Sequence, residues 1–108
     1  MRHDIQEKEG TCVISFTGEV DLESSPEARE ILLKCFGKTS RVLVDLSEVT
    51  YIDSSGVASL VEALQASKKS GSRFALAAVS EPTRRVLELA RLDKVFTMYD
   101  SVEEGLNG

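Results

Sequence analysis

The chain has 108 residues, 42% hydrophobic and 29% charged, which is ordinary composition for one folded domain over residues 1–108. Its formal net charge of -5 argues against a nucleic-acid partner, because such partners are held by lysines and arginines that neutralise phosphates. The sequence has no apolar run long enough for membrane insertion, and its N-terminal segment lacks the apolar stretch of a secretory signal. We therefore expect a cytoplasmic protein.

Few side chains suit catalysis or metal binding. The single histidine, His3, lies beside the N-terminus, so a catalytic triad or a histidine-rich metal site has little to build on. Cys12 and Cys35 lack metal-ligand spacing, and both lie in apolar segments, where we expect them to be buried. Neither glycine-rich phosphate-binding motif occurs. We expect no catalytic residue, cofactor or metal, and hence no enzyme.

The N-terminal third predicts a hairpin followed by a helix. An apolar strand over 12–16 is expected to pair with residues 4–8 across a turn at 9–10. Residues 24–27, Ser-Ser-Pro-Glu, combine a serine cap, an early proline and an acidic first turn, which is a helix start. The helix is expected to stop at Gly37. Its apolar face has helical spacing and consists of Ala28, Ile31, Leu32 and Cys35.

The middle third predicts a buried strand over 41–46, with apolar residues on both faces. A turn at Ser47-Glu48 is expected to separate it from the apolar segment 49–52. The tetrapeptide Asp-Ser-Ser-Gly at 53–56 follows, and an amphipathic helix over 57–71 comes directly after it. The tetrapeptide therefore lies between a strand and a helix start.

The last third predicts a strand over 74–79, a helix that starts at 80–83, a strand over 95–99 and a short helix from 101. Strand and helix alternate along the chain, which is typical of the α/β class. We expect a single small mixed β-sheet with helices packed mainly on one face.

The tetrapeptide at the second helix start is the strongest candidate site. Ser54 or Ser55 is expected at or near the N-cap, beside unpaired backbone N–H groups and the positive end of the helix dipole. A phosphate is tolerated there, and phosphorylation would add about 1.5 to 2 negative charges. In a simpler interpretation, both serines only cap the helix and Gly56 only eases the turn. Asp53 fits two roles: presenting a serine to a kinase, or hydrogen-bonding the loop backbone.

The run V-D-L-S-E-V-T-Y-I-D-S-S-G-V over 44–57 resembles the signature of the STAS domain of bacterial anti-sigma factor antagonists. The segment Gly-Glu-Val-Asp at 18–21 resembles an upstream loop of that family, and 82–87 with Leu92 resembles its third-helix region. The resemblance covers the whole chain. It implies a STAS-like fold and a role in protein binding.

The resemblance also implies a mechanism. Members of the family bind a cytosolic anti-sigma factor that is also a serine kinase, and so free the sigma factor. The kinase phosphorylates the serine after the aspartate, here Ser54, and the phosphorylated antagonist is released until a phosphatase resets it. By this match the switch loop and docking face consist of Asp53, Ser54, Ser55, Gly56, Gly18, Glu19 and Asp21.

Two other functions stay open. Ala58 stands where the antagonists usually carry a second glycine, and the helix after it looks like that of STAS subunits in lipid-transport ABC complexes. Such a subunit would dock on the complex's ATPase, with Ser54 and Ser55 as caps or contacts. A third possibility is a nucleotide-binding module that uses the helix N-terminus as an anion site.

Some remaining residues have a structural and a functional interpretation. Lys68, Lys69 and Arg73 bracket a glycine, and they either form a contact patch for an acidic partner or a nucleotide phosphate, or lie on solvated faces. We favour solvated faces. Tyr51 and Phe96 could anchor an interface, but both lie in apolar strand-like runs, so we expect them in the core.

Overall fold

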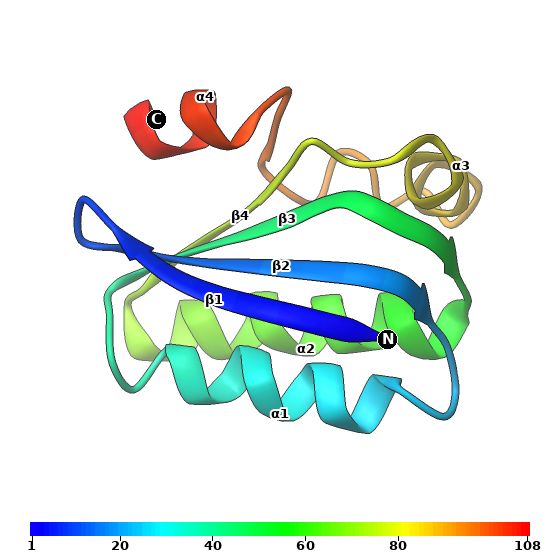
Figure 1. The fold of residues 1–108 in the computed structure, drawn as a ribbon, viewed down its shortest axis with the longest axis horizontal. Coiled ribbons are helices and arrows are strands. Elements are labelled where there is room, and N and C mark those ends of the chain that lie inside the picture. The colour runs from blue at the N-terminus through cyan, green and yellow to red at the C-terminus, as the bar shows by residue number, and fades with distance from the viewer.

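A computed structural model describes residues 1–108, and its centre is one mixed sheet of five strands in the order β1-β2-β3-β4-β5 (Figure 1). The β1–β2 pair is antiparallel, with Ile5 opposite Ile14 as the predicted hairpin requires, and the other pairs are parallel. The strands are β1 Arg2–Lys8, β2 Thr11–Val20, β3 Arg41–Ile52, β4 Arg73–Ala77 and β5 Met98–Tyr99.

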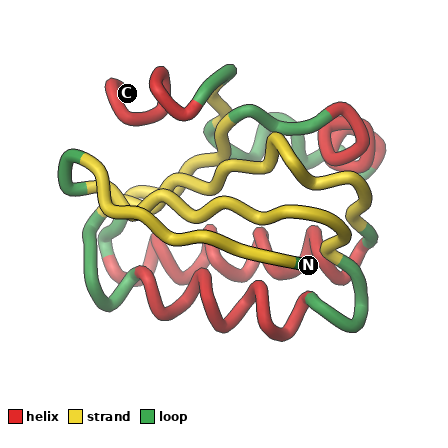
Figure 2. The backbone as a smooth tube through the Cα atoms, viewed as in Figure 1, coloured by secondary structure: helices red, strands yellow, loops and turns green.

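Four helices join and cover these strands: α1 Ser25–Cys35, α2 Ser54–Ser70, α3 Glu81–Leu89 and α4 Val102–Asn107. The two longest, α1 and α2, lie side by side under one face of the sheet, whereas α4 lies over the other face (Figures 1 and 2). The predicted class, a single mixed sheet in an α/β chain, is confirmed.

Side chains along β2 alternate between two apolar layers, as a strand covered on both faces requires. Ile14 and Phe16 belong to the larger core that α1 and α2 cover, while Val13 packs with Leu43 and Ala77 on the α4 side. Full burial of one such side chain stabilises the fold by about 1.5–3 kcal/mol.

Both cysteines belong to the larger core, as predicted: Cys12 and Cys35 are buried. Burial, together with a hydrogen bond to Cys12, raises the pKa of the Cys35 thiol to about 12. The thiol is therefore protonated at neutral pH, and a protonated thiol is a poor nucleophile. Cys35 acts as a small apolar side chain.

The predicted turn at Ser47-Glu48 is wrong, because Arg41–Ile52 is one continuous strand of 12 residues. The register of β3 with β2 shifts twice, after Ser15 and after Gly18, and the extra residue lies on β3 each time. Such β-bulges bend a strand and increase its twist. The first of them leaves two polar residues exposed in the middle of β3, and this exposure produced the turn-like pattern in the sequence.

The last strand is shorter than the predicted 95–99. The backbone N–H of Val95 donates to the Leu92 carbonyl at 3.0 Å, which makes a turn where the strand was expected to begin. Phe96 is buried, as predicted, with its ring centroid 6.4 Å from that of Phe74. Strand pairing therefore starts only after this aromatic contact.

Three other element ends can be compared with the sequence. The strand expected over 74–79 stops earlier, because Ala78 has a left-handed φ of 51° that breaks the extended backbone. α1 ends at Cys35, before the predicted stop at Gly37. The predicted stop of α2 is confirmed: Gly71 is its C-cap, in the left-handed conformation that favours glycine.

Arg41, the first residue of β3, holds the end of α4 against the sheet. Its guanidinium donates to the carbonyl oxygens of Gly105 and Gly108, each at 3.0 Å. A cation at this position satisfies carbonyl groups that a helix C-terminus leaves without partners. Next to this arginine α4 packs closely on β3, since a Cβ on Gly105 would lie 2.7 Å from the Leu43 side chain.

We expect Arg41→Ala to lower the free energy of unfolding by about 1–2 kcal/mol, because hydrogen bonds from a charged group to these carbonyls are lost. Urea denaturation measures the change, with Arg2→Ala as the control for loss of an exposed strand arginine. Amide exchange in α4 should rise selectively. Equal stability of the two variants would contradict this role.

Candidate partner-binding site

The predicted switch serines lie at the junction of β3 and α2. Ser54 is the first residue of α2 and its side chain is exposed, whereas Ser55 is half-buried. The N-cap itself is Asp53, so the serines follow the cap instead of forming it. α2 is 17 residues long, and its aligned peptide dipoles place partial positive charge at the Ser54 end.

Asp53 fastens this junction to the neighbouring loop. Its Oδ1 accepts a hydrogen bond from the Gly56 backbone N–H at 3.0 Å, and its Oδ2 accepts one from the Leu22 N–H at 3.1 Å. Its own N–H donates to the Val20 carbonyl at 3.3 Å. Of the two roles considered for Asp53, hydrogen-bonding of the loop backbone is the one the structure shows.

Asp53→Ala is expected to lower the free energy of unfolding by about 1–3 kcal/mol, because it removes a helix cap and leaves a second backbone donor without its partner. Asp53→Asn retains one acceptor oxygen and should lose about half as much. Chemical denaturation of the two variants beside wild type measures both effects. A wild-type midpoint for Asp53→Ala would contradict the assigned role.

The loop after β2 has its own hydrogen bonds. The Ser24 backbone N–H donates to the Asp21 carboxylate at 3.1 Å, and the Asp21 N–H donates to the Ser24 hydroxyl oxygen at 2.9 Å. Ser24 is the N-cap of α1 by position, but its hydroxyl serves this loop instead of capping the helix. Gly18 precedes the loop with a φ of 97°, a conformation that favours glycine.

The Ser24 backbone N–H, followed by its hydroxyl, lowers the pKa of Asp21 below its ordinary value of 3.8. A folded-state pKa below the unfolded one means that the loop's contribution to stability is present above pH 3.8. That contribution is lost as the pH falls through the folded-state value.

An acidic surface lies along this loop. A cavity of about 520 Å³ is lined by Gly18, Glu19 and Asp21, together with Glu23 and Glu27 from the adjoining turn and helix. The three predicted docking residues are thus brought together, and the Leu22–Asp53 hydrogen bond ties their loop to the residue that directly precedes the predicted switch serines. A partner that binds here needs basic side chains.

Two exposed apolar side chains border the same end of the sheet. The Leu22 side chain is 72% exposed, although the Leu22 backbone N–H is hydrogen-bonded to Asp53, and Tyr51 is 50% exposed. The expectation that Tyr51 lies in the core is wrong, because it pairs with the exposed Glu19 after the second bulge of β3. Leu22 was not singled out in the sequence, where its only signal is an apolar residue between two acids.

Gly56 allows α2 to approach the sheet closely. A Cβ at this position would lie 2.4 Å from the Val20 carbonyl oxygen and 2.6 Å from Cγ1 of Ile52. Both atoms belong to strand ends, so there is no space for a side chain. Gly56 therefore does more than ease a turn: it sets the distance between the Ser54 end of α2 and the strands.

Ala58 lies on the exposed side of α2, in a shallow groove of about 340 Å³ between α1 and α2. Arg29 of α1 and Glu62 of α2 bridge this groove with a nitrogen–oxygen distance of 2.7 Å. Ala58 is therefore a small residue on an outward surface, where another protein could approach the helix closely.

The family of the chain follows from comparison with known sequences. The model of the STAS domain matches residues 2–105, and the chain belongs to this family. An anti-sigma-B factor antagonist of Bacillus subtilis is 26% identical over 103 residues, which cover 95% of this chain and 94% of the relative. The anti-sigma-F factor antagonist RsfB of Mycobacterium tuberculosis is 30% identical over 107 residues, covering 96% of this chain and 85% of the relative.

A solved structure shows the same fold. The Bacillus cell fate determinant SpoIIAA in its phosphorylated form is similar with a TM-score of 0.76 at 20% identity, and the similarity covers 98% of this chain and 97% of that one. The mixed sheet with its four helices is thus the STAS fold. None of its helices combines the length and the apolar character needed to span a membrane.

Proposed function

We propose that the protein is an anti-sigma factor antagonist, which binds a cytosolic anti-sigma factor with serine kinase activity until Ser54 is phosphorylated. The observation that carries the proposal is the position of Ser54: an exposed hydroxyl at the start of α2, next to Asp53, which is hydrogen-bonded to the acidic loop of Glu19 and Asp21. The relatives named above, which are anti-sigma factor antagonists, support the same role.

Phosphorylation at this position changes binding without requiring a change of fold. The N-terminal end of α2 tolerates negative charge, so the antagonist itself stays folded. A partner surface that fits a neutral hydroxyl has to bury the new dianion, and an unpaired buried charge costs several kcal/mol. The two states of the antagonist thus differ in affinity, which is the condition for release.

Ser54 performs no catalysis in this mechanism. The kinase supplies ATP and transfers its γ-phosphoryl group to the Ser54 oxygen, ADP leaves, and the serine proton passes to a base of the kinase. A phosphatase later hydrolyses the phosphoserine with water and restores the hydroxyl. The antagonist contributes an accessible oxygen on a loop whose backbone Asp53 holds in place.

A second candidate function is a subunit of a lipid-transport ABC complex that docks through α2 on the ATPase. The outward position of the small Ala58 in the α1–α2 groove favours it. In that case Ser54 is a contact or a helix residue and not a switch. The two functions make different predictions for a negative charge at position 54.

Affinity capture from native lysate, with wild-type protein and Ser54→Asp as parallel baits, tests the proposal. We expect wild type alone to recover a soluble ATPase of the serine kinase type, and that partner with ATP to phosphorylate wild type but not Ser54→Ala. Recovery of the same ABC transporter by both baits would overturn the proposal and favour the second candidate.

A further inference from the structure

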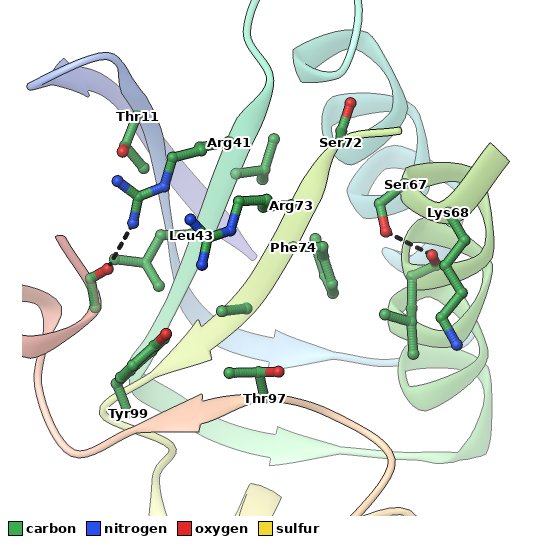
Figure 3. A pocket seen from close by; sticks show the side chains of 14 residues that line it. Thr11, Arg41, Leu43, Ser67, Lys68, Ser72, Arg73, Phe74, Thr97 and Tyr99 are labelled. Atoms are coloured by element: carbon green, nitrogen blue, oxygen red, sulfur yellow. Dashed lines mark hydrogen bonds between the residues drawn. The ribbon is translucent and has the colours of Figure 1, made fainter. Parts of the chain in front are cut away.

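The sheet has two edges, and only one of them offers a long strand. At the β5 edge the strand has two residues, and the chain after it returns over the sheet as α4, whose Gly105 carbonyl Arg41 holds (Figure 3). At the other edge lies β1, whose seven residues are all exposed and pair with β2 without a bulge (Figure 1). A long and regular edge strand of this kind can pair with a further strand.

The turn between β1 and β2 decides which backbone groups of β1 face outward. Its two residues, 9 and 10, have positive φ values of 52° and 78°, as a type I′ hairpin turn requires. Lys8 and its partner across such a turn exchange backbone hydrogen bonds, and bonded pairs alternate with non-bonded pairs along an antiparallel ladder. The groups that point away from β2, and that nothing else in the chain pairs with, are the N–H and C=O of His3, Ile5 and Glu7.

The side chains of these three residues lie on the α1 side of the sheet. Ile5 is opposite Ile14, which belongs to the core that α1 and α2 cover, and residues two apart along a strand share a face. Ile5 is 48% exposed, because no strand lies beyond it. α1 runs beneath this edge, and His3 Nδ1 lies 3.8 Å from Oε1 of Glu27 (Figure 1). The open edge thus has two layers, a strand and a helix.

The side of α1 that faces this edge changes from acidic to basic along the helix. Four residues at i, i+3, i+4 and i+7 share that side. They are Glu27, Glu30, Ile31 and Lys34. α1 runs parallel to β1, because it returns the chain from β2 to the parallel strand β3. From His3 to Ile5 the strand advances about 7 Å, the length of about four or five helix residues, so Ile31 lies near the level of Ile5.

We propose that the open edge binds a second copy of the chain, with the two β1 strands antiparallel about a two-fold axis at Ile5. Ile5 then pairs with Ile5 of the second copy, and His3 with Glu7 of the second copy, through the outward-facing backbone groups. The α1 helices are antiparallel as well, so that Glu27 at the acidic end of one lies beside Lys34 at the basic end of the other. An apolar centre with complementary flanks satisfies the self-complementarity that a two-fold interface requires.

Two features of the chain limit the affinity of this dimer. The net charge of -5 makes the copies repel each other, and Arg2 lies across from Lys8 of the second copy on the other face of the sheet, where solvent screens the like charges. One added strand and one helix contact also bury less area than a standard interface. We therefore expect a reversible dimer with a dissociation constant of about 10–100 µM.

Sedimentation equilibrium of the full chain, without any partner protein and at physiological ionic strength, tests the dimer. We expect Ile5→Lys to weaken it about tenfold or more, because two ammonium groups would meet at the two-fold axis. Leu89→Lys is the matched control, since this leucine is 80% exposed on α3, which packs on β3. Amide exchange of His3, Ile5 and Glu7 should slow as the concentration rises, whereas that of Gln6, already bonded to β2, should change little.

Charge reversal on α1 separates association from folding. Glu27→Lys alone places two lysines together at each flank of the dimer, and Lys34→Glu alone places two glutamates there, so each variant should dimerise about tenfold more weakly than wild type. An equimolar mixture of the two variants should form a heterodimer with near wild-type affinity, because unlike charges face each other again. A monomer at every concentration, equal effects of Ile5→Lys and Leu89→Lys, or a mixture that associates no better than its components would each overturn the proposal. No outcome depends on Ser54 or on an anti-sigma factor.

Discussion

Ser54→Asp is expected to lower the affinity for the anti-sigma factor by about a hundredfold or more, because an unpaired charge buried in an interface costs about 2–5 kcal/mol. The fold should be unaffected, since Ser54 is exposed and a carboxylate in the first turn of a helix is stabilising. Isothermal titration calorimetry with the purified partner measures the affinity, and thermal unfolding of the free variant checks the fold.

Ser54→Asn is the matched control, because asparagine has the shape of aspartate without its charge. We expect Ser54→Asn and Ser54→Ala to bind the partner within about tenfold of wild type, since neither buries a charge. If Ser54→Asn loses as much affinity as Ser54→Asp, size and not charge controls binding, and the phosphorylation switch is contradicted. Unchanged affinity of Ser54→Asp would place position 54 outside the interface.

Gly56→Ala is expected to destabilise the fold by about 2–4 kcal/mol, the range of severe overpacking. The added Cβ would lie 2.4 Å from the Val20 carbonyl oxygen, and backbone at the end of a parallel strand cannot move away as a flexible side chain could. Urea denaturation at equilibrium measures the loss. Gly37→Ala is the control, since its Cβ would meet nothing closer than the Lys34 carbonyl at 3.5 Å.

We expect the same substitution also to displace the Ser54 end of α2. If α2 shifts outward to accept the Cβ, Asp53 loses its geometry with the Gly56 N–H and the loop of Leu22 loosens. Partner affinity should then fall even under conditions where Gly56→Ala is fully folded. Wild-type stability of Gly56→Ala would show that the strand ends adapt, and would remove the packing argument for this glycine.

The sequence predicts the architecture well because its patterns are local. Apolar runs in β2 and at the start of β3, and helical spacing from Val57 and Ala28, each depend on residues close along the chain. The β3 bulges were missed because Ser47 and Glu48 are polar and adjacent, a pattern that a turn and a bulged strand share. Pairing with β2, which is non-local, decides between them.

The sequence predicts the candidate site only in part, because some of its contacts join residues that are far apart along the chain. Ser54, Ser55 and Gly56 were found from the helix start that follows them together with the resemblance of residues 44–57 to the STAS signature. The cap was expected on a serine, but Asp53 takes it, because its carboxylate can accept from Gly56 and Leu22 together, and Leu22 is 31 residues away in sequence. Contacts of that range depend on the folded sheet, and the exposure of Tyr51 depends on the register beyond the second bulge.

The two bulges also decide where β3 can change in length. Between the pairs Ser15–Asp45 and Glu19–Tyr51, β2 advances four residues and β3 advances six, so that each bulge adds one residue to β3. Each bulge absorbs its extra residue locally: the core positions of β3 lie two residues apart up to Leu46, and three apart at Val49 and Ile52, with exposed residues between them. Deletion of one exposed bulge residue, Ser47 or Glu48, should therefore leave Val49 and Ile52 in the core, whereas a deletion within residues 42–46 would turn the side chains beside it to the opposite face.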